Sequence, residues 1–248
     1  MPTVDDFPRV LTRRRLLTTA AAGAATFSLS ACVSVPSTPP AVRPLPQPEP
    51  GPASYSAMYG PMVDNGYEIP PVPIEKIDPR LYRQEVPDPT GERPGTIVVN
   101  VSQHFLYLVR EGGRALRYGV GLGRAGFEWS GRAEIARKRV WPKWFPPAEM
   151  IDRQPELEEY RAKYDEATGE WNGGMQPGIM NPLGARALYI YEDGKDTLYR
   201  VHGSPEWWTI GKSVSSGCVR MMNQDVIHLY DQVPIDSPIL VTDGPSMV

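Results

Sequence analysis

The sequence is poor in metal-binding residues and in excess charge of either sign. It has two cysteines and three histidines in 248 residues, and none has a spacing such as C-x-x-C or H-E-x-x-H. We therefore expect no metal site and no cofactor. The net charge is −3 without a basic stripe, so we expect no nucleic-acid partner.

Long apolar runs are also missing. The run from Leu16 to Leu29 is shorter than the roughly 20 residues that span a bilayer. It follows the basic cluster Arg13-Arg14-Arg15, which is the pattern of an export signal. We assign residues 1–32 to this signal, and its arginine pair resembles a twin-arginine signal.

The signal ends in Leu29-Ser30-Ala31-Cys32, which resembles a bacterial lipoprotein box. Cleavage there leaves Cys32 as a lipidated N-terminus, so we expect a protein of the periplasm or cell envelope with a membrane tether at Cys32. The alternative is an ordinary signal peptide in which this cysteine occurs by chance.

Proline separates the signal from a domain rich in β-branched residues. Residues 33–94 hold more than half of the 28 prolines, a composition typical of an extended spacer. Several apolar residues between Tyr55 and Tyr82 leave open whether the later half packs on the domain. From residue 95 to 243, apolar runs separated by glycine-rich turns predict a mainly β domain.

Two features of this domain invite other interpretations. Residues 121–126 match the G-x-G-x-x-G fingerprint, but a strand-like run follows where a nucleotide site needs a helix, so we interpret them as a loop between strands. Residues 141–183 are irregular, with a predicted helix at 148–166, and we interpret them as a lid or wall near the site. We expect Trp141 and Trp144 to pack in the domain.

The segment 202–220, HGSPEWWTIGKSVSSGCVR, contains His202 and Cys218. A thiol needs a base to become a nucleophile, and an imidazole can take its proton and return it to a leaving amine. Gly217 admits a substrate carbonyl close to the backbone, where the N–H groups of Gly217 and Cys218 can bind an oxyanion. The alternatives are a buried structural cysteine and a disulfide with Cys32, which would abolish the reactivity of Cys218.

The spacing of further residues resembles the L,D-transpeptidase (YkuD-type) catalytic domain. The resemblance covers roughly residues 93–243, and the residues that carry it are His202-Gly203, Ile210-Gly211, Ser215-x-Gly217-Cys218-Val219-Arg220-Met221, Asn223 and Asp225. It implies a mainly β barrel-like or sandwich fold with one or two helices, with Cys218 as nucleophile and His202 as proton donor and acceptor. Many members carry histidine where this chain has Ser216.

Other residues near the motif have two interpretations. Arg220 either binds a substrate carboxylate or braces the loop, and Ser215 either bonds His202 or stabilises the turn. Trp207 and Trp208 are candidates for substrate contact. The remaining histidines, His104 and His228, are expected to be structural or exposed.

The resemblance implies a peptidoglycan L,D-transpeptidase that joins a donor and an acceptor stem peptide in a 3→3 cross-link. With water as the acceptor, the same site would be a cysteine hydrolase, cutting stem peptides or releasing proteins tethered to the wall. An alternative of another class is a catalytically silent wall-binding protein.

Overall fold

The computed structural model describes residues 52–123, 129–215 and 217–244, which all belong to one unit, residues 47–248. The predicted export signal, Cys32, the proline-rich stretch up to residue 51 and Ser216 lie outside the described residues. Among the described residues, no helix combines the length and apolarity needed to cross a membrane.

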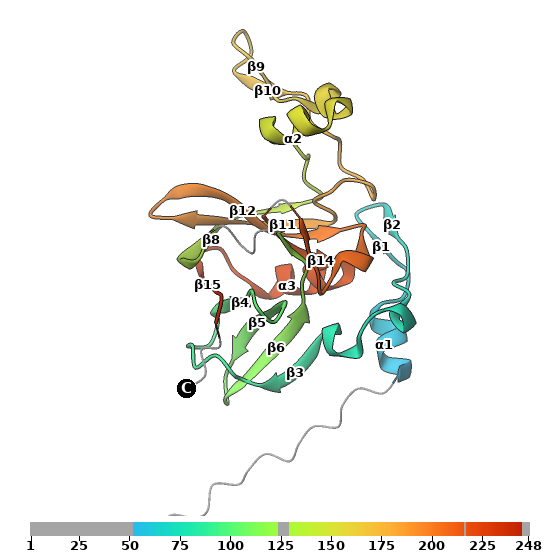
Figure 1. The fold of residues 1–248 in the computed structure, drawn as a ribbon, viewed down its shortest axis with the longest axis vertical. Coiled ribbons are helices and arrows are strands. Elements are labelled where there is room, and N and C mark those ends of the chain that lie inside the picture. Colours follow the sequence, from blue (N-terminus) through green and yellow to red (C-terminus); the bar gives the residue numbers. More distant parts are fainter. Residues whose placement is uncertain (1–51, 124–128, 216, 245–248) are drawn as a thin grey trace, which may run out of the picture. The chain divides into compact units, whose positions relative to one another are not determined.

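One nine-stranded sheet dominates the fold (Figure 1). Its strands, in spatial order, are β14 (Val219–Met222), β12 (Lys195–Ser204), β11 (Arg186–Glu192), β8 (Gly131–Val140), β15 (Ser237–Thr242), β4 (Ile97–Asn100), β5 (Phe105–Arg110), β6 (Arg114–Gly119) and β3 (Gln84–Pro87). Most neighbours are antiparallel, but β12 with β14 and β15 with β4 are parallel. The prediction of a mainly β fold is confirmed.

Helix α3 (Asn223–Gln232) packs against β11, β12 and β14 (Figure 1). It starts at Asn223, directly after β14. Its buried face includes Val226 and Leu229, which join the side chains that β11, β12 and β14 turn toward it, such as Leu188 and Val201. This core fixes the strands that carry the candidate site.

Residues 52–94, the later half of the stretch interpreted as a spacer, are folded. They form α1 (Pro52–Met58), the hairpin β1 (Met62–Asp64) and β2 (Tyr67–Ile69), two 3₁₀ turns at Ile74–Lys76 and Pro79–Leu81, and the edge strand β3. Tyr59 and Tyr82 are buried in a cluster that also contains Ile210 and Met222. In the sequence, these two residues lie before and after Cys218. This half therefore packs on the domain.

The segment 141–183 contains α2 (Ala148–Arg153), a 3₁₀ helix (Pro155–Tyr160) and the hairpin β9 (Lys163–Asp165) and β10 (Glu170–Asn172). The helix predicted over 148–166 is wrong beyond Arg153, because Pro155 cannot supply the N–H that a continuing α-helix needs. The expected packing of Trp141 is confirmed, since its buried ring donates Nε1–H to Asp64 at 2.7 Å. Trp144 is half-buried.

The glycine-rich loop leads into strands. Gly121 and β7 (Leu122–Gly123) precede residues 124–128, which lie outside the described residues, and β8 follows. Strand β7 pairs with β13 (Ser213–Ser215). Gly121 exchanges backbone hydrogen bonds with Arg220, and a Cβ on it would lie 2.6 Å from the carbonyl oxygen of Thr209. A glycine here lets two backbones approach, which agrees with a loop between strands.

Candidate active site

Two parallel strands bring His202 and Cys218 together. In the register of β12 with β14, Val201 pairs with Val219 and His202 with Arg220. Side chains alternate along a strand, so His202 and Arg220 share one face while both valines enter the core. Cys218 directly precedes Val219 and thus falls opposite Arg200, on the face of His202.

His202 is held as a neutral imidazole. Its side chain is buried, and Nδ1 lies 2.6 Å from the carbonyl oxygen of Gly203. A carbonyl only accepts, so Nδ1 carries the proton and Nε2 is the basic nitrogen of the neutral ring. Burial lowers the pKa of His202 from 6.5 to about 4, helped by the charges of Arg220 and Arg200 and opposed by the carbonyls of Gly203 and Pro182.

Cys218 is half-buried, and desolvation raises the pKa of its thiol above the ordinary value of 9.0. A backbone hydrogen bond from Arg200 and the charges of Arg200 and Arg220 oppose this rise. At neutral pH the pair is therefore a thiol beside an imidazole, an arrangement in which a neutral ring can accept the thiol proton.

Gly217 has a conformation and a neighbour that both require glycine. Its φ is +127°, and a Cβ at this position would lie 3.0 Å from the Tyr199 ring. Residues other than glycine rarely adopt such a φ. The backbone just before the thiol is thus fixed by Tyr199. Ser215 ends β13.

Arg220 has a partner that neither sequence interpretation named. Its Nη1 donates to Oε2 of Glu206 at 2.6 Å. Glu206 precedes the 3₁₀ turn of Trp207–Thr209, so the ion pair ties this turn to the Cys218 strand. Trp208 is 51% exposed, whereas Trp207 is half-buried against the Tyr59 cluster.

Sequence reasoning missed Arg200. Its guanidinium binds Asp196 through two hydrogen bonds of 2.7 and 2.9 Å, and its Cζ lies 4.4 Å from the centre of the Tyr189 ring. The position two residues before His202 on the same strand was the available signal, because alternation places both side chains on one face.

Asn223 explains Gly203 of the motif and also Gly184, which lies upstream of it. Its buried Oδ1 accepts from the N–H of Ala185 at 2.9 Å, and a Cβ on either Gly184 or Gly203 would overlap this oxygen. The glycine after His202 therefore makes room for the start of α3.

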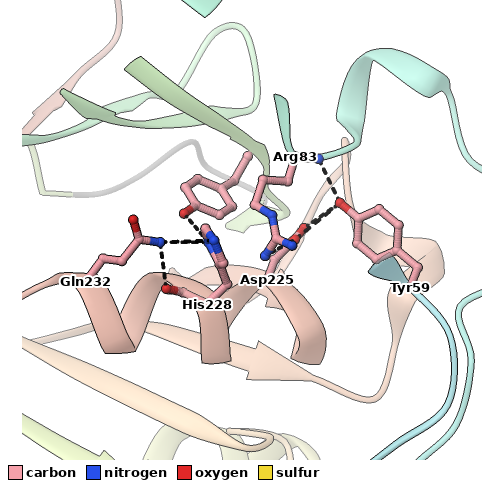
Figure 2. Close-up of polar contacts among 6 residues, drawn as sticks. Tyr59, Arg83, Asp225, His228 and Gln232 are labelled. Atoms are coloured by element: carbon pink, nitrogen blue, oxygen red, sulfur yellow. Dashed lines mark hydrogen bonds and ion pairs between the residues drawn. The ribbon is translucent and has the colours of Figure 1, made fainter. Parts of the chain in front are cut away.

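Asp225 anchors the N-terminal part of the unit beneath the site. Figure 2 shows its carboxylate facing Tyr59 and Arg83. The Tyr59 hydroxyl donates to both carboxylate oxygens, at 3.2 and 3.0 Å, and accepts from the N–H of Arg83 at 2.7 Å. Burial raises the pKa of Asp225 from 3.8 to about 7, against the charge of Arg83.

The two other histidines make structural contacts. His228 lies on α3, where Nδ1 is 2.9 Å from the Tyr118 hydroxyl and 2.8 Å from Nε2 of Gln232 (Figure 2). His104 has its Nε2 2.9 Å from Oγ of Ser213 on β13. No cluster of three metal-ligating side chains occurs among residues 52–123, 129–215 and 217–244.

Two curated proteins are similar in sequence to this chain. Probable L,D-transpeptidase ErfK/SrfK of Salmonella typhimurium is 30% identical over 77% of this chain and 59% of its own length. Probable L,D-transpeptidase YbiS of Escherichia coli is 34% identical over 60% of this chain and 45% of its own length. The chain thus spans about half the length of these relatives.

A solved structure, described as a probable carnitine operon oxidoreductase from Brucella melitensis, is 44% identical over 65% of this chain and 94% of its own, with a TM-score of 0.44. We infer nothing about the fold or function of this chain from a TM-score this low. The model of the YkuD family, the L,D-transpeptidase catalytic domain, matches residues 94–241. Because this match covers more than half of the chain, the protein belongs to the L,D-transpeptidase catalytic domain family.

Proposed function

We propose that this protein is a peptidoglycan L,D-transpeptidase that forms 3→3 cross-links between stem peptides. The observation that carries the proposal is the placement of Cys218 and His202 on one face of two adjacent parallel strands, within the segment that the family model matches.

In the first step, His202 takes the thiol proton and the sulfur of Cys218 attacks the carbonyl on the L-centre of the diamino acid. The N–H groups of Gly217 and Cys218 bind the oxyanion. When the tetrahedral intermediate collapses, the carbon–nitrogen bond breaks and His202 returns the proton to the departing D-alanine. A thioester remains on Cys218.

In the second step, the side-chain amine of a neighbouring stem attacks the thioester. His202 accepts the proton that the amine loses, the new amide forms and the thiol is restored. The low pKa of His202 suits this role, because the ring is a neutral base at every pH above about 4. Trp207, Trp208 and Arg220 border the groove for the two peptides in this proposal.

Mass spectrometry of the products tests the proposal. The protein is incubated with disaccharide-tetrapeptide beside the Cys218→Ala variant. We expect cross-linked dimers that have lost one D-alanine, and none with the variant. Tripeptide without dimers would assign the site to a hydrolase. No Cys218-dependent product from the stem peptide would point to a protein-attached substrate or to a silent wall-binding protein.

We also propose that the protein is exported to the periplasm or cell envelope and anchored there by a lipid on Cys32. The basic cluster, the short apolar run and the four residues ending in Cys32 support this. Metabolic labelling with palmitate tests it: label should enter the wild-type protein and not Cys32→Ala. Equal label in both would contradict the anchor.

A further inference from the structure

The face of the sheet that carries the candidate site is rich in arginine. In one row across the strands, Arg139 on β8 pairs with Ala187 on β11, which pairs with His202 on β12. In the next row, Arg137 pairs with Tyr189, which pairs with Arg200. Paired residues point to the same side of a sheet, so both arginines of β8 share the face of His202.

Tyr189 lies between these arginines. The Cζ atoms of Arg137 and Arg200 are 5.2 and 4.4 Å from the centre of its ring. The charges of Arg137, Arg139 and Arg200 all act on its hydroxyl, while burial keeps the pKa of Tyr189 above 10.0. The hydroxyl thus remains a hydrogen-bond donor among three guanidinium groups.

The four basic groups on this face differ in their partners. Arg200 is neutralised by Asp196 and Arg220 by Glu206. Arg137 and Arg139 are exposed, and the part of the chain that the structure describes offers neither of them an ion pair. The nearest acidic residue of β8 on this face is Glu134, which pairs with Tyr191 in the row beyond Arg137. An anion that approaches Arg137 and Arg139 therefore meets two positive charges and one negative charge of β8.

Arg137 and Arg139 lie close enough to His202 and Cys218 to contact a peptide bound at the candidate site. Strands lie about 4.8 Å apart, so Arg139 is about 10 Å from His202 and Arg137 about 14 Å from the position opposite Arg200 that Cys218 takes. An extended peptide advances roughly 3.5 Å per residue, and an arginine side chain shortens the gap further. A group one residue away from the reacting diamino acid is within reach.

We propose that Arg137, Arg139 and Tyr189 form a carboxylate-binding subsite for the donor stem peptide. The ligand is the free α-carboxylate of the residue that precedes the diamino acid. Arginine suits this ligand because its planar fork donates two parallel hydrogen bonds to a carboxylate. The assignment of a stem peptide rests on the proposed function; the anion site itself rests on the geometry of this face.

Binding to the catalytically blocked full-length Cys218→Ala protein tests the subsite. Calorimetry compares two tetrapeptide stems that differ only in whether this α-carboxyl group is free or amidated. We expect the free acid to bind about tenfold more tightly, in the range of one charged hydrogen bond. In Arg137→Gln/Arg139→Gln, the two peptides should bind equally, and Tyr189→Phe should reduce the preference severalfold.

Two variants control for folding and for general charge. Arg110→Gln removes an equally exposed arginine from β5, three strands from β8 on the side away from β14, and should keep the full preference. Arg137→Lys/Arg139→Lys keeps the charge without the fork and should keep part of it. The subsite is wrong if the tenfold preference survives the double glutamine change, or if the free acid does not bind at millimolar concentration.

Turnover of the same stems is measured with enzyme that retains Cys218. This experiment distinguishes failure of the subsite from failure of the proposed function. Amidation of the donor should raise KM about tenfold, and only while both arginines are present. An arginine-dependent effect confined to amidation of the acceptor would overturn the donor assignment. If no cross-link forms but the binding preference depends on both arginines, the proposed function fails and the carboxylate-binding site stands without its donor role.

Discussion

His202 and His228 lie on opposite sides of the same strand layer, and burial lowers the pKa of each to about 4. Their surroundings differ. His228 sits on α3 between Tyr118 and Gln232, whereas His202 shares a sheet face with Cys218 and four arginines. The shifted pKa is therefore no mark of catalysis by itself. What distinguishes His202 is a cysteine, Cys218, directly before the adjacent strand β14.

The largest difference between the two sides should appear on replacing each histidine. We expect His202→Gln to reduce cross-linking by about 10³-fold, as befits loss of a general base. His228→Gln should leave the rate within about twofold, costing about 1 kcal/mol of stability through its lost hydrogen bonds. Product formation and thermal unfolding measured on both variants test this, and similar rate losses in the two would remove the distinction.

The pH dependence of kcat/KM tests whether His202 acts as a buried neutral base. His202 must be neutral to accept a proton, and its pKa is about 4. We therefore expect kcat/KM to fall on the acid side with an apparent pKa near 4, and no loss between pH 7 and pH 5. An acid limb centred near 6.5 would show that His202 is not the buried base described here.

Gly203 links the two sides, because it follows His202 and contacts Asn223 on α3. Gly203→Ala places a methyl group against Oδ1 of Asn223, so we expect a loss of about 1–3 kcal/mol of stability from overpacking. Gly178→Ala is the control, since a Cβ there meets nothing within 4 Å. Chemical denaturation measures both, and equal stability of the two variants would contradict the packing argument.

The last prediction concerns Asp225. Its pKa is higher in the folded chain, about 7, than its ordinary value of 3.8, so the folded state binds the proton more tightly. The contribution of Asp225 to the free energy of unfolding is then greatest below pH 4 and falls as pH rises toward 7. Asp225→Asn should have a flatter dependence of unfolding free energy on pH from 4 to 7. The same slope in both proteins would place the titration elsewhere.

Sequence patterns predict the strands and helix of the central domain better than the segments that pack around it. Apolar runs separated by glycine-rich turns predict a mainly β domain over residues 95–243, because burial of one face imposes a period on the sequence. The folding of residues 52–94 was left open, since Tyr59 and Tyr82 are buried by partners more than 100 residues away. The helix expected over 148–166 ends early at a proline.

The motif placed Cys218 and His202 in one segment, but the charges around them depend on pairing between strands. Arg200 acts on both residues only because β12 lies beside β14, and Arg137 and Arg139 reach this face only through β11. Nothing in their local sequence distinguishes these arginines from solvated surface residues. Register, which long-range packing sets, decides which of them adjoin the site.

The central claim is that Cys218 is the nucleophile, activated by His202. Intact-mass spectrometry after incubation with a carbapenem, an acylating mimic of the donor, tests it most directly, with the adduct mapped by peptide digestion. The account predicts one adduct per chain, on Cys218, with none in Cys218→Ala and much slower formation in His202→Gln. No adduct on the wild-type protein, or an adduct that persists in Cys218→Ala, would contradict it.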